Sequence, residues 1–427
     1  MKTFLLHNVT IPGLLHGNYR VLFNSAEIIN IERNEGSLPK ADEVIDGQGA
    51  MLLPGAIDAH VHFREPGLIH KADIATESRA ALAGGVTSFF DMPNTVPQTV
   101  TQEAWQEKCL LANEKSAINY AFFIGVTNDN IDRILQIDPS LIPGYKVFLG
   151  SSIGGMLVNN DAVLEKLFAN ARAPIVVHAE DENIIAQSRE RIIRQYGENP
   201  PIHTHSSIRS ADACIAATRH ALSLARKYPQ AHLHIAHVST AAEVTLIQQA
   251  KAEGLRVTAE VSPHHLLFTN EDYPVLGARI KMNPSVKTAL DREALRNAVR
   301  DGIIDIIATD HAPHTLAEKE GDALTAISGA PMVQFSLPLM LDMFDPETVR
   351  RVMCENPARI FGLKDRGLLA VGNAPEMVLV KPIPQGFAVT DNDVLSKCGW
   401  TPLVGRTLRH KVIKTILPRP TALTFHH

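Results

Sequence analysis

The sequence predicts an α/β fold, a (β/α)8 barrel of the TIM type with a small β-sandwich domain formed by both termini. Two observations predict it. Eight short apolar segments alternate with helix-like segments over about 300 residues in the middle of the chain. Strand-like segments of another kind, separated by turns, occupy both chain ends. We therefore expect a small β domain from residues 1–53 with 363–427, and a catalytic barrel from residues 54–362.

The chain ends predict short strands. Residues 19–23 and 28–32 are rich in apolar residues, and Asn34-Glu35-Gly36-Ser37 has the composition of a turn. Near the other terminus, residues 377–380 and 411–416 are again strand-like. Because two similar ends flank a different middle, we expect both termini to build one small β domain.

The middle of the chain predicts a parallel barrel. Continuous apolar segments of about four to eight residues fit strands that are buried on both faces of a parallel sheet. Gly84-Gly85 can end the helix before the second strand. A doubly wound open sheet is the alternative, but no Gly-x-Gly-x-x-Gly motif follows the first segment. The predicted strands are 56–60, 86–91, 120–125, 145–149, 175–178, 233–237, 256–260 and 306–310.

Composition and charge exclude several classes of protein. Hydrophobic residues make up 45% of the chain, which is enough for a sizeable core, and the net charge of -5 argues against a nucleic-acid surface. No apolar segment approaches the ~18 residues of a membrane span. The four cysteines form no Cys-x-x-Cys pair, which favours a reducing compartment. We expect a cytoplasmic protein that binds neither nucleic acid nor membranes.

Metal-binding side chains follow several of the predicted strands. In a barrel of this class, the carboxyl ends of the strands meet at one rim, where the active site lies. His60 and His62 are two residues apart, so both imidazoles would lie on one side of the first strand. His178, His237 and Asp310 lie at three later strand ends. Imidazoles and carboxylates are common ligands of divalent ions, so the sequence predicts a metal site at this rim.

Other histidines are weaker candidates. His232 and His234 have the opposite strand parity to His237, so we expect them to point away from it. His264 and His265 near the seventh strand end are either ligands or a pair that packs beside the site.

Lys146 is a cation among these candidate ligands. The apolar residues around it predict a buried strand, and burial beside other cations lowers the pKa of a lysine. A neutral amine can react with carbon dioxide to give a carbamate, whose two oxygens can bridge two metal ions. A two-metal site of this kind supplies a hydroxide at neutral pH. An ordinary surface lysine is the alternative.

Asp310 is a candidate for proton transfer. A carboxylate at the last strand end can bind one metal ion, accept the proton of the hydroxide and pass it to a leaving nitrogen. An aspartate that caps the next helix is the alternative.

Arg64 is a candidate for substrate recognition. It has the same strand parity as His62, and a guanidinium beside a positive metal centre needs an anion, so we expect it to bind a carboxylate. A surface arginine paired with Glu65 is the alternative. Each candidate asparagine is also a common turn residue. Further polar contacts to a small substrate are expected from Asn94, Asn283 and His314.

The sequence resembles the dihydroorotases of the amidohydrolase superfamily at three motifs. Residues 58–67, Asp-Ala-His-Val-His-Phe-Arg-Glu-Pro-Gly, resemble the first signature of that family. Residues 91–95, Asp-Met-Pro-Asn-Thr, resemble the second, and residues 308–314, Ala-Thr-Asp-His-Ala-Pro-His, resemble the last. The match continues through residues 356–362 and covers most of the chain.

The resemblance implies a zinc-dependent cyclic amide hydrolase. Its reaction would be the reversible cyclisation of N-carbamoyl-L-aspartate to L-dihydroorotate, through a metal-bridging hydroxide, in de novo pyrimidine (UMP) biosynthesis. The implied metals are two Zn²⁺ ions, with His60 and His62 on one, His178 and His237 on the other, and carboxylated Lys146 as the bridge. Asp310 would be a metal ligand and the catalytic acid/base, with substrate contacts from Arg64, Asn94, Asn283 and His314.

Some features depart from the family or leave alternatives open. Certain bacterial members bridge their metals with an aspartate after the fourth strand, and residues 150–154 contain no carboxylate, which favours Lys146. Residues 328–332 resemble the substrate-contacting loop only loosely, so contacts from Ser328 and Gly329 stay open. An allantoinase or dihydropyrimidinase is a second interpretation, but these enzymes typically lack an arginine at the position of Arg64. A non-catalytic homologue would have lost metal ligands. A homodimer is an assembly that the sequence leaves open.

Overall fold

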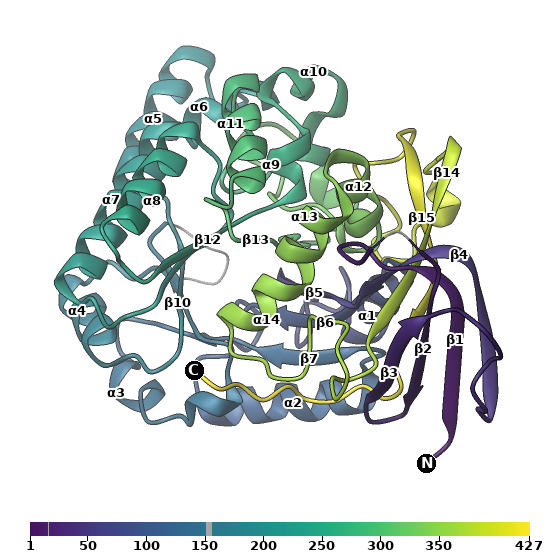
Figure 1. The fold of residues 1–427 in the computed structure, drawn as a ribbon. Coiled ribbons are helices and arrows are strands. Elements are labelled where there is room, and N and C mark those ends of the chain that lie inside the picture. The colour runs from purple at the N-terminus through teal and green to yellow at the C-terminus, as the bar shows by residue number, and fades with distance from the viewer. Residues whose placement is uncertain (16, 151–155) are drawn as a thin grey trace.

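Strands from both chain ends form one six-stranded sheet (Figure 1). The computed structural model describes residues 1–15, 17–150 and 156–427. The order is β15-β14-β4-β1-β2-β3, and only β1 and β4 pair in parallel. One face packs Leu6, Val21, Leu52 and Met377 into a core of their own. The β-rich part built from both termini is therefore confirmed, while the proposed boundaries at 53/54 and 362/363 stay a prediction. The strands are β1 (Thr3–Thr10), β2 (Tyr19–Asn24), β3 (Ile28–Arg33), β4 (Glu43–Pro54), β14 (Met377–Ala388) and β15 (Thr407–Ile416).

The middle of the chain forms the predicted barrel of parallel strands. All eight predicted segments contain strands, and the third is divided into two by Phe123, whose N–H donates to the Asp91 carbonyl at 3.1 Å. The last strand lies beside the first, because Val61 bridges His311 in parallel and the His62 N–H donates to the His311 carbonyl at 2.8 Å. The strands are β5 (Ala56–Val61), β6 (Val86–Asp91), β7 (Asn119–Phe122), β8 (Ile124–Gly125), β9 (Tyr145–Phe148), β10 (Ile175–His178), β11 (Leu233–Ile235), β12 (Val257–Val261) and β13 (Ile306–Ile307).

Helices connect the barrel strands and lie around them (Figure 1). Their starts are fixed locally, since Asp73, Thr240 and Thr288 each accept a hydrogen bond from a backbone N–H in the first turn. Gly84 ends the first helix, as its position before β6 predicted. The helices are α1 (Ile74–Ala83), α2 (Gln102–Lys115), α3 (Ile131–Ile134), α4 (Asp161–Asn170), α5 (Glu182–Tyr196), α6 (His205–Ile208), α7 (Ala211–Lys227), α8 (Ala241–Ala252), α9 (Pro263–Leu267), α10 (Tyr273–Leu276), α11 (Ala289–Arg300), α12 (Ser336–Met343), α13 (Pro346–Arg350) and α14 (Asn356–Ile360).

A buried apolar cluster fills much of the barrel interior. Ile57, Phe90 and Val176 from three strands pack with Phe361, which follows α14, and Phe425, near the end of the chain. The Phe90 and Phe361 rings meet edge to face, with centroids 5.2 Å apart. Because the interior is filled with side chains, it is a core rather than a pore. Among the described helices, none combines the length and apolar character that crossing a membrane requires.

Candidate active site

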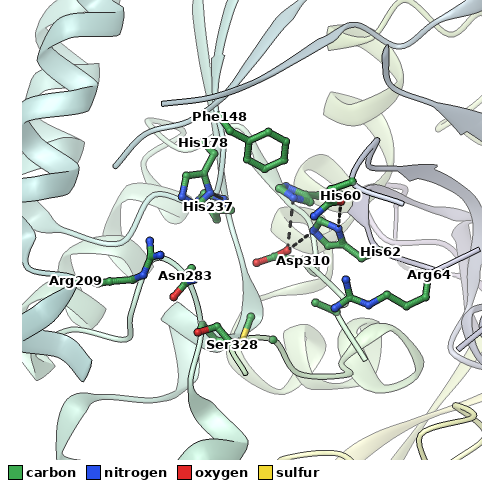
Figure 2. A pocket seen from close by; sticks show the side chains of 14 residues that line it. His60, His62, Arg64, Phe148, His178, Arg209, His237, Asn283, Asp310 and Ser328 are labelled. Atoms are coloured by element: carbon green, nitrogen blue, oxygen red, sulfur yellow. Dashed lines mark hydrogen bonds and ion pairs between the residues drawn. The ribbon is translucent and has the colours of Figure 1, made fainter. Parts of the chain in front are cut away.

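A cavity of about 300 Å³ lies where the barrel strands end. Figure 2 shows its side chains converging from opposite sides, with Arg64 at one end and Arg209 at the other. Most of the predicted site residues line it, and Lys146 and His314 do not. The predicted residues in the wall are His60, His62, Arg64, Asn94, His178, His237, Asn283 and Asp310.

His60, His62 and Asp310 form a compact cluster at one side of the cavity. Each offers a ligand atom within 4.8 Å of the other two, and all three are buried. The Asp310 Oδ1 atom lies 3.5 Å from His60 Nε2 and 3.1 Å from His62 Nε2. Burial would raise the pKa of the Asp310 carboxyl, but the neighbouring imidazoles outweigh it and hold this pKa well below its usual range. Burial lowers the pKa of His62 to about 4. Neutral imidazole and ionised carboxylate are the forms that bind metal.

His178 and His237 form a second pair across the cavity. Their Nδ1 and Nε2 atoms lie 2.9 Å apart, and the ring of His60 lies 5.3 Å from that of His237. Burial lowers the pKa of both imidazoles, that of His237 well below its usual value. The His237 Nδ1 atom is buried and has no hydrogen-bond partner among the described residues.

Three of the four imidazoles have a side-chain oxygen of a neighbouring residue at one of their ring nitrogens. His60 Nδ1 contacts Glu260, His62 Nδ1 donates to the Asn94 side-chain oxygen at 2.8 Å, and His178 Nε2 donates to Glu180 at 2.8 Å. A hydrogen bond at one ring nitrogen leaves the other nitrogen as the lone-pair donor, which is how metal-binding histidines are held. The arrangement therefore fits one or more divalent ions.

Lys146 on β9 is fully buried, and its Nζ atom makes no hydrogen bond with any residue in the described ranges. Burial lowers the pKa of this amine to about 8, against the opposing charges of Glu260 and Asp310. The sequence correctly placed Lys146 on a buried strand. An unpaired buried amine with a lowered pKa is the form that carbamate formation requires.

Arg64 is held at the other end of the cavity by neutral acceptors. Its Nε donates to the Pro313 carbonyl at 3.0 Å, and its Nη2 lies 2.9 Å from His314 Nε2. On the far side of the imidazole, Lys71 Nζ lies 3.2 Å from His314 Nδ1 and 2.8 Å from Glu318. Burial and these cations keep the pKa of His314 far below its usual value. A neutral imidazole has one acceptor nitrogen, and both nitrogens of His314 face a cation, so His314 lies between Arg64 and Lys71 rather than in the cavity wall.

The backbone is left-handed at three of the cavity residues. The φ angles of Arg64, His237 and Asp310 are 69°, 34° and 48°. Non-glycine residues rarely adopt this region, and such positions gather at functional sites. His237 follows the end of β11, so its side chain no longer obeys strand parity. His234 does not line the cavity, and its Nε2 atom lies 3.2 Å from Glu260, which contacts His60.

His265 packs beside the site, while the buried Nε2 atom of His264 has no hydrogen-bond partner among the described residues. His265 contacts Ser262 at 2.9 Å and the Pro284 carbonyl at 3.0 Å, next to Asn283. Residues 151–154 of the stretch expected to lack a bridging carboxylate lie outside the described residues.

Sequence reasoning missed Glu180, Arg209 and Glu260. Glu180 follows His178 by two residues and Glu260 ends a predicted strand, so both positions carried a usable signal. Arg209 donates to Glu180 at 2.5 Å and lines the cavity. It lies between α6 and α7, and no sequence pattern marks that position as functional.

Comparisons with known proteins agree with this geometry. A family model described as the amidohydrolase family matches residues 51–416. A dihydroorotase of Halobacterium salinarum is 39% identical over 83% of this chain and 82% of its own length. An allantoinase of Bacillus velezensis is 33% identical over 88% of this chain and 84% of its own. The structure of an L-hydantoinase (dihydropyrimidinase) from Arthrobacter aurescens has a TM-score of 0.92 at 26% identity and covers 99% of this chain and 100% of its own. These likenesses support a cyclic amidohydrolase that acts on a small molecule, and the chain belongs to the amidohydrolase family.

Proposed function

We propose that the protein is a dihydroorotase, which interconverts N-carbamoyl-L-aspartate and L-dihydroorotate in pyrimidine biosynthesis. The observation that carries the proposal is Arg64. Its side chain is buried at 3% exposure and lines the cavity, yet it forms no ion pair with a carboxylate of the described residues. A buried guanidinium without a counterion is suited to an anionic substrate. Dihydroorotate carries a carboxylate, while allantoin, hydantoin and dihydrouracil rings do not.

The proposed metal centre consists of two zinc ions. His60, His62 and Asp310 would hold one ion, and His178 and His237 the other, with Lys146 as a carbamate between them. Such ions lower the pKa of a bound water and polarise an amide carbonyl.

The other residues have roles that follow from their contacts. Arg64 binds the substrate carboxylate and so fixes the ring in the cavity. Asn94 keeps its side-chain N–H groups for the substrate, because its oxygen is used by His62. The Asn283 side-chain oxygen is buried without a partner among the described residues, so it can accept a ring N–H. Asp310 accepts a proton and returns it to the leaving nitrogen.

The sequence-based role of His314 changes in one respect. His314 was expected to contact the substrate, and its contacts favour an indirect role through Arg64. A cytoplasmic location and a homodimer complete the proposal.

The second candidate is hydrolysis of an uncharged cyclic ureide, which the names of the allantoinase and hydantoinase relatives favour. The test is an assay of the purified, zinc-loaded protein with L-dihydroorotate, allantoin and hydantoin. We expect kcat/KM for L-dihydroorotate to exceed the others by about 30-fold or more, the equivalent of a buried charge-assisted contact. Turnover of allantoin or hydantoin with L-dihydroorotate untouched would contradict the proposal.

A further inference from the structure

Glu260 on β12 lies behind the metal-binding histidines rather than in the cavity wall. It is 1% exposed, and its carboxylate meets groups from two other parts of the barrel. His60 Nδ1 on β5 contacts Oε1, and the backbone N–H of His237 donates to the same oxygen at 3.3 Å. His234 Nε2 on β11 lies 3.2 Å from Oε2. One buried carboxylate therefore receives hydrogen bonds linked to both halves of the candidate metal centre.

Glu260 is itself held by a buried polar ladder between β11 and β12. The His234 Nδ1 atom lies 2.8 Å from the Thr258 hydroxyl, and that hydroxyl lies 2.9 Å from His232 Nε2. His234 and Thr258 are direct partners in the parallel register. The ladder leaves the Glu260 side chain little freedom to turn away from His60.

The main chain at Glu260 supports the same region. Its carbonyl accepts the Val238 N–H at 2.8 Å, next to the Oε1 contact with the His237 N–H. His237 has a left-handed φ of 34°, a conformation that persists only where its surroundings enforce it. Glu260 thus accepts hydrogen bonds from the His237 N–H and the Val238 N–H, the two peptide groups on either side of the His237 α-carbon.

We propose that Glu260 is a positioning residue that aligns one histidine from each half of the metal centre, His60 through its ring and His237 through its backbone. This inference rests on the proposed metal centre and deepens it. The three groups that meet the carboxylate are donors, provided that His60 keeps its Nε2 lone pair for a metal. A carboxylate only accepts hydrogen bonds, so it satisfies all three. A glutamine has the same size but presents one N–H2 group, which would oppose a donor.

The test is the zinc affinity of the Glu260→Gln variant, measured by competition of metal-free protein with a chromophoric chelator. Partners that orient metal-binding histidines typically contribute about 10- to 100-fold in metal affinity, so we expect a loss of that size. Turnover should recover when zinc is supplied in excess, because no group that touches the substrate has changed. The Glu376→Gln variant is the matched control. Glu376 is another buried carboxylate, and its partners Asn119, Thr87 and Arg366 all lie outside the cavity wall. This control should bind zinc as the wild type does.

Wild-type zinc affinity in a folded Glu260→Gln variant would overturn the inference. If that variant does not fold, Glu260→Asp provides the test, because its shorter carboxylate cannot reach both His60 and His237. An affinity equal to that of the wild type would overturn the inference there as well. A wild-type protein that binds no divalent ion would instead refute the proposed metal centre, so the two failures are distinct.

Discussion

Two regions of the cavity, the histidine cluster and the surroundings of Arg64, differ in the balance of their buried charges. At the histidine end, the imidazoles are neutral or face the carboxylates Asp310, Glu180 and Glu260. At the Arg64 end, the buried cations Arg64 and Lys71 lie around a neutral His314, with Glu318 as an acidic partner. The first end suits metal cations and the second suits an anionic group of the substrate. A cyclic amide with a carboxylate on its ring would reach both.

The largest effect that we expect is at the histidine end. Lys146→Ala should remove most of the bound zinc and reduce turnover to background, because it removes the amine that would carry the bridging carbamate. Metal content by mass spectrometry and turnover of L-dihydroorotate measure this directly. A variant that retains two zinc ions and full turnover would show that Lys146 is no bridge.

Asp310→Asn should separate proton transfer from metal binding. The amide can keep an oxygen towards a metal but cannot accept a proton, so we expect kcat to fall by about 10²- to 10⁴-fold. Steady-state kinetics with parallel metal analysis provide the measurement. Near-normal kcat with full metal content would assign the proton to another residue.

Arg64→Ala should affect only the anionic end of the cavity. Loss of a buried charge-assisted contact costs about 2–5 kcal/mol, so we expect KM for L-dihydroorotate to rise by about 30-fold or more. Metal content should stay unchanged, since Arg64 contacts no proposed ligand among its hydrogen-bond partners. Loss of zinc from this variant would mean that the two ends of the cavity are not independent.

His314→Asn should have the smallest effect. If His314 acts through Arg64, its loss removes one hydrogen bond to the guanidinium, about 0.5–1.5 kcal/mol, and raises KM about 2- to 12-fold. The Arg64→Ala/His314→Asn double variant tests whether His314 acts through Arg64. If it does, adding His314→Asn to Arg64→Ala should not raise KM further. Additive effects would indicate a direct contact between His314 and the substrate.

The sequence predicted the barrel and most of the cavity wall because both depend on local patterns. Short apolar segments define strands. A residue such as His178, at the carboxyl end of a strand, therefore lies at the rim of the barrel, and this placement needs no information from distant residues. The ladder of His232, His234, Thr258 and Glu260 depends on the register between two strands and could not be read from one strand.

The most direct test of the account compares two substrates that share a ring, L-dihydroorotate and dihydrouracil, which lacks the carboxylate. The measurement is the ratio of their kcat/KM values in the wild type and in Arg64→Ala, both loaded with zinc. The account predicts a strong preference for L-dihydroorotate in the wild type, about 30-fold or more, and a preference close to one in the variant. An unchanged ratio in Arg64→Ala would contradict the claim that this buried guanidinium selects an anionic ring.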